Sequence, residues 1–346
     1  MTLSTLKGSV AERIPLPAGW RGAALEERLP IHLKTWIWAL GGTPAVLFAV
    51  QVVTGVLLTF YYVPQPMHAY ESVRQITFSV RFGWLVRGLH QAASQLMIVA
   101  VLLHMIRVFV TRGYRRPREV TWVIGVALFL LTLGFAFTGY ALLYDQLSYW
   151  ATTVGTNMIA EVPVVGTPML YMLRGGADVN PQTLTRFYNF HIGVIPTVFF
   201  VLLVGHILLV RLHGVSTLEG DEDRTDTYPF FPDHVLREAA VALVVLVAMV
   251  VYVMAVPPGL GEKADPNLTP TSIRPEWYFF PSYRWLKLVP VQIGLWTSTL
   301  FVVGMFFWPW IDRAIEKVVP GKQIGTLVGV TFWLITLVLL VWEAFS

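Results

Sequence analysis

Four histidines lie in strongly apolar stretches of the sequence, where few other side chains could bind a metal. His90 and His104 are 14 residues apart in LHQAASQLMIVAVLLH, and His191 and His206 are 15 residues apart further along the chain. On an α-helix these spacings return to within about 40° and about 60° of the starting direction, so each pair shares a face. The two histidines of a pair lie about 21–22 Å apart along the axis, which is too far to share one ion. The sequence therefore predicts two sites at two depths.

The composition indicates that lipid surrounds these stretches. The 346 residues are 55% hydrophobic and only 13% charged, whereas about a quarter of the residues in soluble domains are charged. The formal net charge of +4 is mild and forms no dense basic stripe, so a nucleic-acid partner is not expected. The chain has no cysteine, which excludes disulfides, thiolate metal sites and thioether-attached haem.

Apolar segments of about 20 residues predict an all-α integral membrane protein with seven transmembrane helices. The shorter stretch Val162–Leu173 contains two prolines and is expected to be interfacial or re-entrant. The predicted spans are Trp36–Val63, Gly88–Ile106, Trp122–Tyr144, Phe190–Val210, Ala239–Val256, Leu288–Ile311 and Gln323–Trp342.

Basic residues in the short loop after the second span set the expected orientation. The loop TRGYRRPRE carries four arginines against one acid, which places it in the cytoplasm. The N-terminus then also lies inside, and seven spans leave the C-terminus outside. The acidic stretch at residues 216–235 is the clearest linker. It divides a four-helix domain, residues 1–215, from a three-helix domain, residues 236–346.

Each transmembrane span runs opposite to the one before it, so the second and fourth spans run parallel. His90 is then level with His191, and His104 is level with His206. One imidazole from each helix at each level suits two bis-histidine haem b groups in a four-helix bundle. A single histidine in a span is often only a hydrogen-bonded interior residue, but two pairs at matching spacing favour ligands.

Glycines repeat the histidine period on the neighbouring spans. Gly41 and Gly55 are 14 residues apart, as are Gly125 and Gly139. Glycine lets a large flat group approach a helix backbone, although ordinary packing of small residues in a membrane is an open alternative.

The chain resembles cytochrome b of the quinol-oxidising bc complexes, and more closely cytochrome b6 joined to subunit IV of the b6f complexes. The resemblance covers nearly everything after about residue 30. Its motifs are LGGTPAVLFAVQVVTG, FGWLVRGLH, RRPREVTWV, TGYALLYDQLSYWA, VPVVGTPMLYMLRGG, LTRFYNFH and RPEWYFFP.

The resemblance implies a quinol:cytochrome c (or plastocyanin-like) oxidoreductase subunit in the cell inner membrane. Quinol would be oxidised near the outer face, and electrons would pass through the two haems to quinone near the inner face, with proton translocation. The implied partners are a Rieske iron–sulfur protein, a cytochrome c-type subunit or carrier, quinone and lipid. A homodimeric complex is also implied.

The motif PEWY is the family's quinol-oxidation motif, and it implies a role for Pro275, Glu276, Trp277 and Tyr278. A carboxylate at a dry interface can act as a general base for a quinol proton. An aromatic belt with one solvated glutamate is the alternative. Tyr140 is expected to line the same pocket.

Four arginines are candidates to pair with haem propionates or a quinone pocket, because arginine offers a bidentate fork to carboxylates. Positive charge at a helix end is the competing explanation. Arg87 and Arg186 would serve the outer haem, and Arg118 and Arg211 the inner haem or quinone.

The chain departs from the b6 pattern at three positions. Ala39 stands where b6 proteins have a haem-attaching cysteine, so no covalent c-type haem is expected. Leu143 and Tyr144 replace a proline and a tryptophan. A di-haem anchor of a quinone-linked dehydrogenase and a cofactor-free transporter with histidine proton relays are the alternative functions. The PEWY motif favours the bc-type function, and the transporter predicts no visible absorption.

Overall fold

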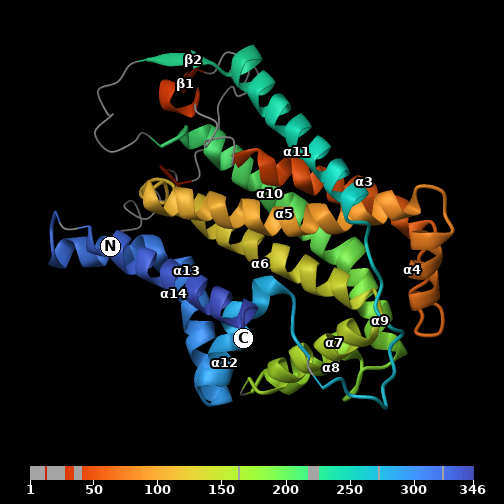
Figure 1. Cartoon of the computed structure of the whole chain (residues 1–346). Helices are drawn as coiled ribbons and strands as arrows, with labels where there is room; N and C mark the ends of the chain where they lie inside the picture. Colours follow the sequence, from red (N-terminus) through yellow and green to blue (C-terminus); the bar gives the residue numbers. More distant parts are fainter. Residues whose placement is uncertain are drawn as a thin grey trace.

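The computed structural model describes residues 12–13, 28–34, 41–162, 164–216, 226–271, 273–321 and 323–346. Helices dominate this part of the chain (Figure 1). In order they are η1 (Ile31–Lys34), α3 (Thr43–Thr59), α4 (Ala69–Phe78), α5 (Gly83–Val110), α6 (Glu119–Ala141), α7 (Gln146–Ala160), α8 (Gly166–Arg174), α9 (Pro181–Asn189), η3 (Phe190–Val194), α10 (Ile195–His213), η4 (Phe230–His234), α11 (Val235–Ala255), η5 (Trp277–Phe279), α12 (Phe280–Leu288), α13 (Val291–Val318) and α14 (Ile324–Ala344).

Six helices among the described residues are long and apolar enough to cross a membrane. The apolar helix Thr43–Thr59 is shorter, at 17 residues, and the first part of the predicted span, residues 36–40, lies outside the described residues. The all-helical membrane architecture is confirmed, while a count of seven spans stays a prediction. The six helices are Gly83–Val110, Glu119–Ala141, Pro181–His213, Phe230–Ala255, Val291–Val318 and Ile324–Ala344.

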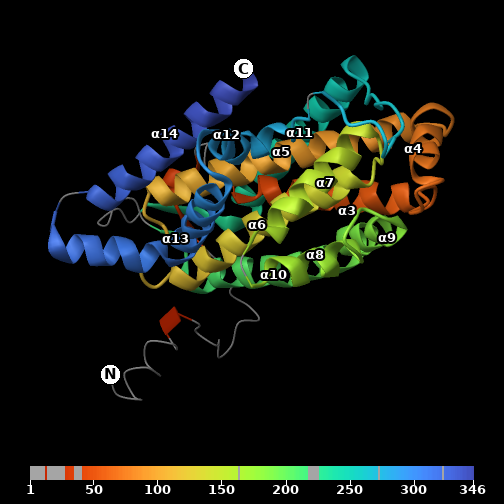
Figure 2. The same cartoon turned by 90° about the horizontal axis from the view of Figure 1, so that it is seen from below.

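Helices α3, α5, α6 and α10 lie side by side as a bundle (Figures 1 and 2). Ala93 and Met97 of α5 are buried in its core against Leu47 of α3 and Leu128 of α6. Phe48 packs on Phe199 of α10, with ring centroids 4.5 Å apart. We call the end of the bundle that carries His90 the His90 end, and the opposite end the His104 end.

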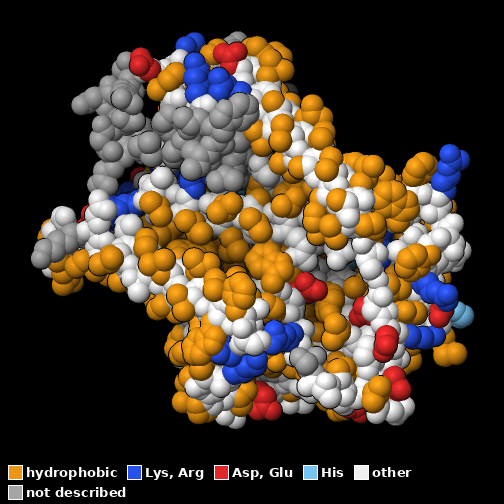
Figure 3. Space-filling view, viewed as in Figure 1, with side chains coloured by type: hydrophobic (Ala, Val, Ile, Leu, Met, Phe, Trp, Pro, Cys, Tyr) orange, Lys and Arg blue, Asp and Glu red, His pale blue; other side chains and the backbone are white. Residues whose placement is uncertain are grey.

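The C-terminal helices cover the bundle on two sides. Helix α11 packs against α5, where Gly88 admits Val253: a Cβ at Gly88 would lie 2.4 Å from that side chain. Helix α13 packs against α6, and Trp122 Nε1 donates a 2.6 Å hydrogen bond to the Met305 carbonyl. Hydrophobic side chains cover most of the face in Figure 3, and the charged side chains gather in small groups, as expected for a chain in lipid.

Helices α4, α7, α8 and α9 gather at the His90 end (Figures 1 and 2). Helix α7 begins with a capping box, in which the Asp145 side chain accepts from Ser148 N and the Ser148 hydroxyl accepts from Asp145 N. Such a cap satisfies backbone donors that would otherwise lack partners. The stretch expected to be interfacial folds mainly as the short helix α8, which packs against α7.

A short ribbon adds the only strands of the described residues. Strand β1 (Arg28–Pro30) pairs antiparallel with β2 (Thr227–Pro229), and Leu29 faces Tyr228. The ribbon joins the N-terminal region to the segment before α11. Most of the acidic linker, residues 217–225, lies outside the described residues, so the proposed domain boundary rests on the sequence.

Candidate functional site

The four histidines meet in two pairs across the bundle. The ring centroids of His90 and His191 lie 6.2 Å apart, and those of His104 and His206 lie 6.4 Å apart. Helix α5 carries one member of each pair, and η3 and α10 carry the other. The first histidine of one helix, His90, faces the first histidine of the other, His191, and His104 likewise faces His206. The two helices therefore run parallel, as the sequence predicted.

The unequal spacing of the two pairs has a local structural cause. Residues 190–194 form a π-helical turn, and His191 lies in it. A π-turn accommodates one extra residue relative to an α-helix. The 15-residue spacing from His191 to His206 therefore covers about the same rotation as the 14-residue spacing on α5. As a result, His191 of η3 and His206 of α10 both face α5.

Each imidazole faces one of the four glycines that share the histidine period. A Cβ at Gly55 would lie 3.3 Å from His90 Cε1, and one at Gly139 would lie 2.7 Å from His191 Cε1. At the other end, a Cβ at Gly125 would lie 3.4 Å from His206 Cε1, and one at Gly41 would lie 4.0 Å from His104 Cε1. Glycine at these positions leaves the space that the rings occupy.

Threonines next to two of the glycines orient the imidazoles at the His90 end. Thr54 Oγ lies 2.8 Å from His90 Nδ1, and Thr138 Oγ lies 3.1 Å from His191 Nδ1. Each hydroxyl donates its own proton to a carbonyl four residues earlier, at 2.6 Å to Val50 and 2.7 Å to Gly134. The threonine oxygen therefore accepts from Nδ1–H, which leaves Nε2 unprotonated and able to bind a metal.

The pair geometry fits a metal held between two axial imidazoles. A metal–nitrogen bond of about 2 Å and a distance of about 1.1 Å from ring nitrogen to ring centre place two such rings about 6.2 Å apart. The observed centroid separations, 6.2 and 6.4 Å, match this value. With the facing glycines, each level offers the axial ligands and the small side chains that a haem requires.

The PEWY segment lies against the bundle at the His90 end. Glu276 is the residue before the short helix η5, and its Oε2 lies 3.5 Å from Nε2 of Gln95 on α5. Burial raises the pKa of Glu276 above its ordinary value, and the nearby Asp145 adds to this rise. Burial also raises the pKa of Tyr278, to which Glu276 contributes. A half-buried carboxyl of this kind keeps its proton to higher pH than an exposed one, and such groups are candidates for proton transfer.

The neighbours of Glu276 include the tyrosine expected from the sequence. Glu276 acts electrostatically on Tyr140 of α6, so the PEWY segment and the TGY motif approach each other. Pro275 and Trp277 flank the carboxyl and are half-buried. The four PEWY residues and Tyr140 are thus brought to one place.

The four candidate arginines contact backbone carbonyls, an aromatic ring and, for Arg87, also the Thr77 hydroxyl at 3.0 Å. Arg87 donates to the carbonyls of Pro258 and Gly259 at 3.3 and 2.7 Å. Arg118 donates to the carbonyls of His213 and Gly214, both at 3.2 Å, at the C-terminal end of α10. Their predicted roles beside propionates or quinone stay predictions.

The remaining two arginines, Arg186 and Arg211, contact residues of neighbouring elements. Arg186 donates to the carbonyls of Tyr171, at 2.8 Å, and Met172. The Arg211 guanidinium lies 3.8 Å from the centroid of the Phe230 ring. Both contacts join neighbouring elements.

Sequence reasoning missed several polar residues that the structure adds to the two ends. Thr54 and Thr138 could have been found, because the dipeptide Thr-Gly occurs at both glycines of the His90 end, Gly55 and Gly139. Gln95 gave only the weak signal of an amide in a span. Arg107 lies on the same face as His104, with its terminal nitrogen 3.2 Å from His104 Nδ1.

Glu238 of α11 is a further missed residue, at the His104 end. A Cβ at Gly42 would lie 2.2 Å from its carboxylate, and its Oε1 lies 3.7 Å from His234 Nε2. Gly42 adjoins Gly41, which faces His104. An acid and a histidine therefore lie beside the glycine that follows Gly41.

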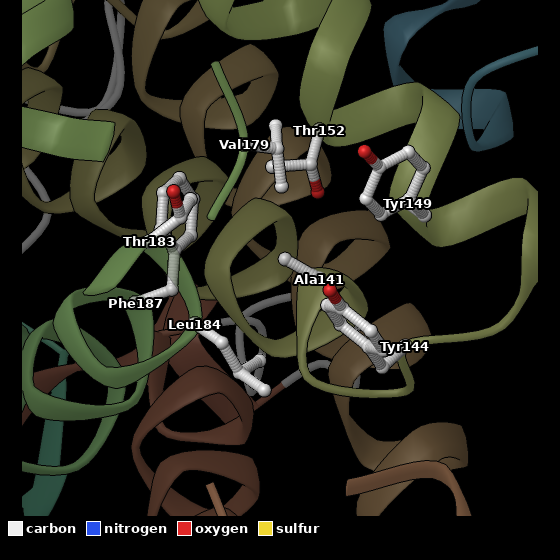
Figure 4. Close-up of a pocket in the computed structure, with 8 residues that line it drawn as sticks. All are labelled: Ala141, Tyr144, Tyr149, Thr152, Val179, Thr183, Leu184 and Phe187. Carbon is white, nitrogen blue, oxygen red and sulfur yellow. The ribbon is translucent and has the colours of Figure 1, made fainter. Parts of the chain in front are cut away.

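A small cavity lies at the His90 end, between the end of α6, α7 and α9 (Figure 4). Its volume is about 10 Å³, which is room for about one water molecule. Tyr144, one of the departures from the family pattern, lines it and has a positive φ of 51°. Burial raises the pKa of Tyr144 to about 12. Leu143 lies beside it, while Ala39 lies outside the described residues.

Comparison with known proteins identifies both parts of the chain. Residues 25–214 match the family model for cytochrome b/b6/petB, and residues 263–345 match that for the C-terminal part of cytochrome b/b6/petD. Cytochrome b of Rickettsia prowazekii is 33% identical over 307 residues, which cover 86% of this chain and 76% of that protein. Cytochrome b6 of Heliobacterium modesticaldum is 43% identical over 191 residues, 55% of this chain and 90% of that protein.

A bc-complex subunit and a solved structure extend the likeness. The cytochrome bc complex cytochrome b subunit of Chlorobaculum thiosulfatiphilum is 35% identical over 319 residues, covering 89% of this chain and 74% of that protein. A chain of a hyperthermophilic respiratory Complex III matches with a TM-score of 0.75 and 25% identity, over 92% of this chain and 91% of that chain.

The bundle and its C-terminal helices thus define a multi-pass membrane cytochrome of the bc type. The chain belongs to the cytochrome b/b6 family and fits the arrangement in which b6 is fused to subunit IV. It is a cytochrome b subunit of a quinol oxidoreductase complex, and membership of the family implies haem b. The transporter alternative is not supported.

Proposed function

We propose that this subunit oxidises quinol at the His90 end, reduces quinone at the His104 end, and couples the two reactions to proton translocation. The observation that carries the proposal is the pair of histidine levels, each with two facing imidazoles and two facing glycines. When bound, two haem b groups supply one-electron transfer between the ends. His90 and His191 would hold one, and His104 and His206 the other.

At the His90 end, Glu276 is proposed to accept a proton from a quinol hydroxyl. Its half-buried carboxyl has a raised pKa, which makes it a stronger base than an ordinary exposed carboxylate. Tyr140, Pro275, Trp277 and Tyr278 would form the surrounding pocket and restrict access of water. Oxidation of one quinol releases two protons and two electrons. Glu276 would take one proton and water the other, and the two electrons would pass to the proposed Rieske partner and to the haem that His90 and His191 would hold.

At the His104 end, Glu238 is proposed to deliver a proton to quinone, with His234 as its neighbour towards the aqueous phase. The carboxylate lies against Gly42, beside the glycine that faces His104. The proposed orientation follows the arginine-rich loop: the His104 end and the N-terminus face the cytoplasm, and the His90 end and the C-terminus face outward. The proposed partners are a Rieske protein, a cytochrome c-type acceptor and a second copy of the complex.

The variant Glu276→Gln tests the proposed proton acceptor. General-base assistance typically contributes a factor of about 10²–10⁴, and water can replace part of it, so quinol oxidation should slow at least about tenfold. The raised pKa predicts that wild-type activity increases with pH as Glu276 loses its proton, and this limb should disappear in the variant. The assay is steady-state quinol oxidation by the purified complex between pH 5 and 9.

The control for this variant is the haem spectrum, which should keep both haems. If Glu276→Gln assembles normally and turns over at the wild-type rate across this pH range, Glu276 is not the proton acceptor. The loop would then be an interfacial aromatic belt.

A further inference from the structure

The amide of Gln95 joins two members of the PEWY segment to helix α5. Its Nε2 donates towards Glu276 Oε2 at 3.5 Å, and its Oε1 accepts a hydrogen bond from Trp277 Nε1. One side chain therefore uses its donor on the carboxylate and its acceptor on the neighbouring indole. All three side chains are half-buried.

The position of Gln95 on α5 separates it from the histidine level. It follows His90 by five residues, which is about 7.5 Å along the axis and about 140° round the helix. Gln95 therefore points away from the face that carries His90 and towards the C-terminal part of the chain. Helix α5 therefore carries His90 on one face and, on another face, Gln95, which contacts the Glu276 carboxylate.

The other charged and titratable neighbours of Glu276 cannot fix its carboxylate in the same way. Asp145, at the start of α7, repels the charged form. Tyr140 of α6 and Tyr278 of the same segment interact with Glu276 electrostatically. The Gln95 amide stabilises the charged carboxylate of Glu276. Its hydrogen bond from Trp277 Nε1 also fixes the position of the adjoining residue.

We propose that Gln95 is a positioning residue for quinol oxidation, which holds Glu276 against α5 in the orientation that receives the quinol proton. This inference rests on the proposed role of Glu276. The plain alternative is that Gln95 only helps the loop to pack. In that case its removal would not act through Glu276.

The test uses Gln95→Met in the complete complex, since methionine keeps the length of the side chain and lacks the amide. Quinol oxidation should slow about three- to tenfold through kcat, as expected for the loss of a hydrogen bond to a charged group. The rising limb of the pH profile should move to higher pH, because the removed donor had favoured the charged carboxylate. Gln91→Met, on the exposed side of the same helix, is the matched control and should match the wild type.

The double variant Gln95→Met/Glu276→Gln separates positioning from packing. If Gln95 acts through Glu276, the double variant should turn over within about twofold of Glu276→Gln alone. Independent, multiplicative losses would overturn the inference, as would a wild-type rate and pH profile in Gln95→Met. Slow Glu276→Gln with normal Gln95→Met would refute only this inference, whereas normal Glu276→Gln would refute the proposed function as well.

An isosteric variant decides the matter if Gln95→Met loses haem or fails to assemble. Gln95→Glu keeps the length and an acceptor for Trp277, but replaces the amide donor with a second carboxyl facing Glu276. Its rising limb should move to higher pH by more than that of Gln95→Met. A wild-type rate and pH profile in Gln95→Glu would overturn the inference.

Discussion

The imidazole of His191 rests on the backbone of Gly139, so the size of residue 139 controls where the ring can lie. The same relation holds for the other three pairs of histidine and glycine, although with more space. At the His90 end, the threonine before each glycine also binds the imidazole Nδ1. A dipeptide on one helix thus sets both the position and the tautomer of a histidine on another.

The variant Gly139→Ala should disturb the haem at the His90 end. The added methyl group would lie 2.7 Å from His191 Cε1, so the ring must move and its hydrogen bond to Thr138 must weaken. We expect the haem b content of the purified chain to fall from two towards one, measured as the pyridine haemochrome.

Gly134→Ala on the same helix is the matched control, because its methyl group would meet only Ile195 Cδ1 at an ordinary 3.8 Å. Full haem content and an unchanged absorption spectrum in Gly139→Ala would show that the contact does not constrain His191.

For single residues, the spacing along the sequence predicted that His90 faces His191 and that His104 faces His206, because all four histidines follow nearly the same helical period. It could not predict Gln95, because its contacts to Glu276 and Trp277 join residues about 180 positions apart. Glu238 was missed for the same reason, since only the packing of α11 against α3 brings it to Gly42. Such contacts depend on which helix faces lie together, which the period does not specify.

Among the elements, the π-turn at residues 190–194 shows where a regular helical wheel fails. A rotation of 100° per residue places His191 and His206 about 60° apart. Because the π-turn takes up one extra residue, the rotation between them corresponds to about 14 residues instead of 15. The sequence correctly predicted which histidines face each other. It did not predict the π-turn, which brings His191 and His206 closer to the same rotation as His90 and His104. The predicted span ends also differ: α5 begins at Gly83 rather than Gly88, and α13 extends to Val318 rather than Ile311.

An ionic cluster fixes α14 to α12, the helix that follows the PEWY segment. The fully buried Glu343 lies 2.7 Å from Lys287 Nζ and 3.4 Å from Arg284. Glu343→Gln removes the negative charge that both Arg284 and Lys287 pair with in this cluster. Because the Lys287 side chain is 40% exposed, water offsets part of the lost stabilisation. We expect a loss of about 1–3 kcal/mol in the free energy of unfolding, seen as a lower Tm of the haem absorbance.

The control for this cluster is Glu71→Gln, because Glu71 is 46% exposed and pairs with Arg74 at 3.4 Å. Its effect should be no more than about 0.5 kcal/mol. Equal Tm values for the two variants would show that the cluster does not hold α14 to α12.

Over the whole molecule, the chain carries two different chemical environments at the two ends of one bundle. The His90 end gathers PEWY, Tyr140 and the helices α7 to α9, and the His104 end gathers Glu238, His234 and Arg107. Composition and hydropathy predicted the membrane and the helical architecture, since both follow from the solvent around the chain. The assignment of each end to a side of the membrane rests on the arginine-rich loop and is open to direct test.

Reporter fusions at Ser346 test the orientation. Four arginines between the second and third spans place that loop inside, and an odd number of spans then places the C-terminus outside. A reporter that works only outside the cytoplasm should be active at Ser346 and inactive in the loop at residues 112–118. Activity of a cytoplasmic reporter at Ser346 would indicate six or eight spans.

If two independent histidine pairs hold two haems at two depths, the purified subunit has a fixed haem stoichiometry. Pyridine haemochrome of the purified subunit should give two haem b per polypeptide. His104→Leu should reduce this to one and leave the spectrum of the His90 level. A value near zero or one in the wild-type chain, or the loss of both haems in His104→Leu, would show that the two histidine pairs do not hold separate haems.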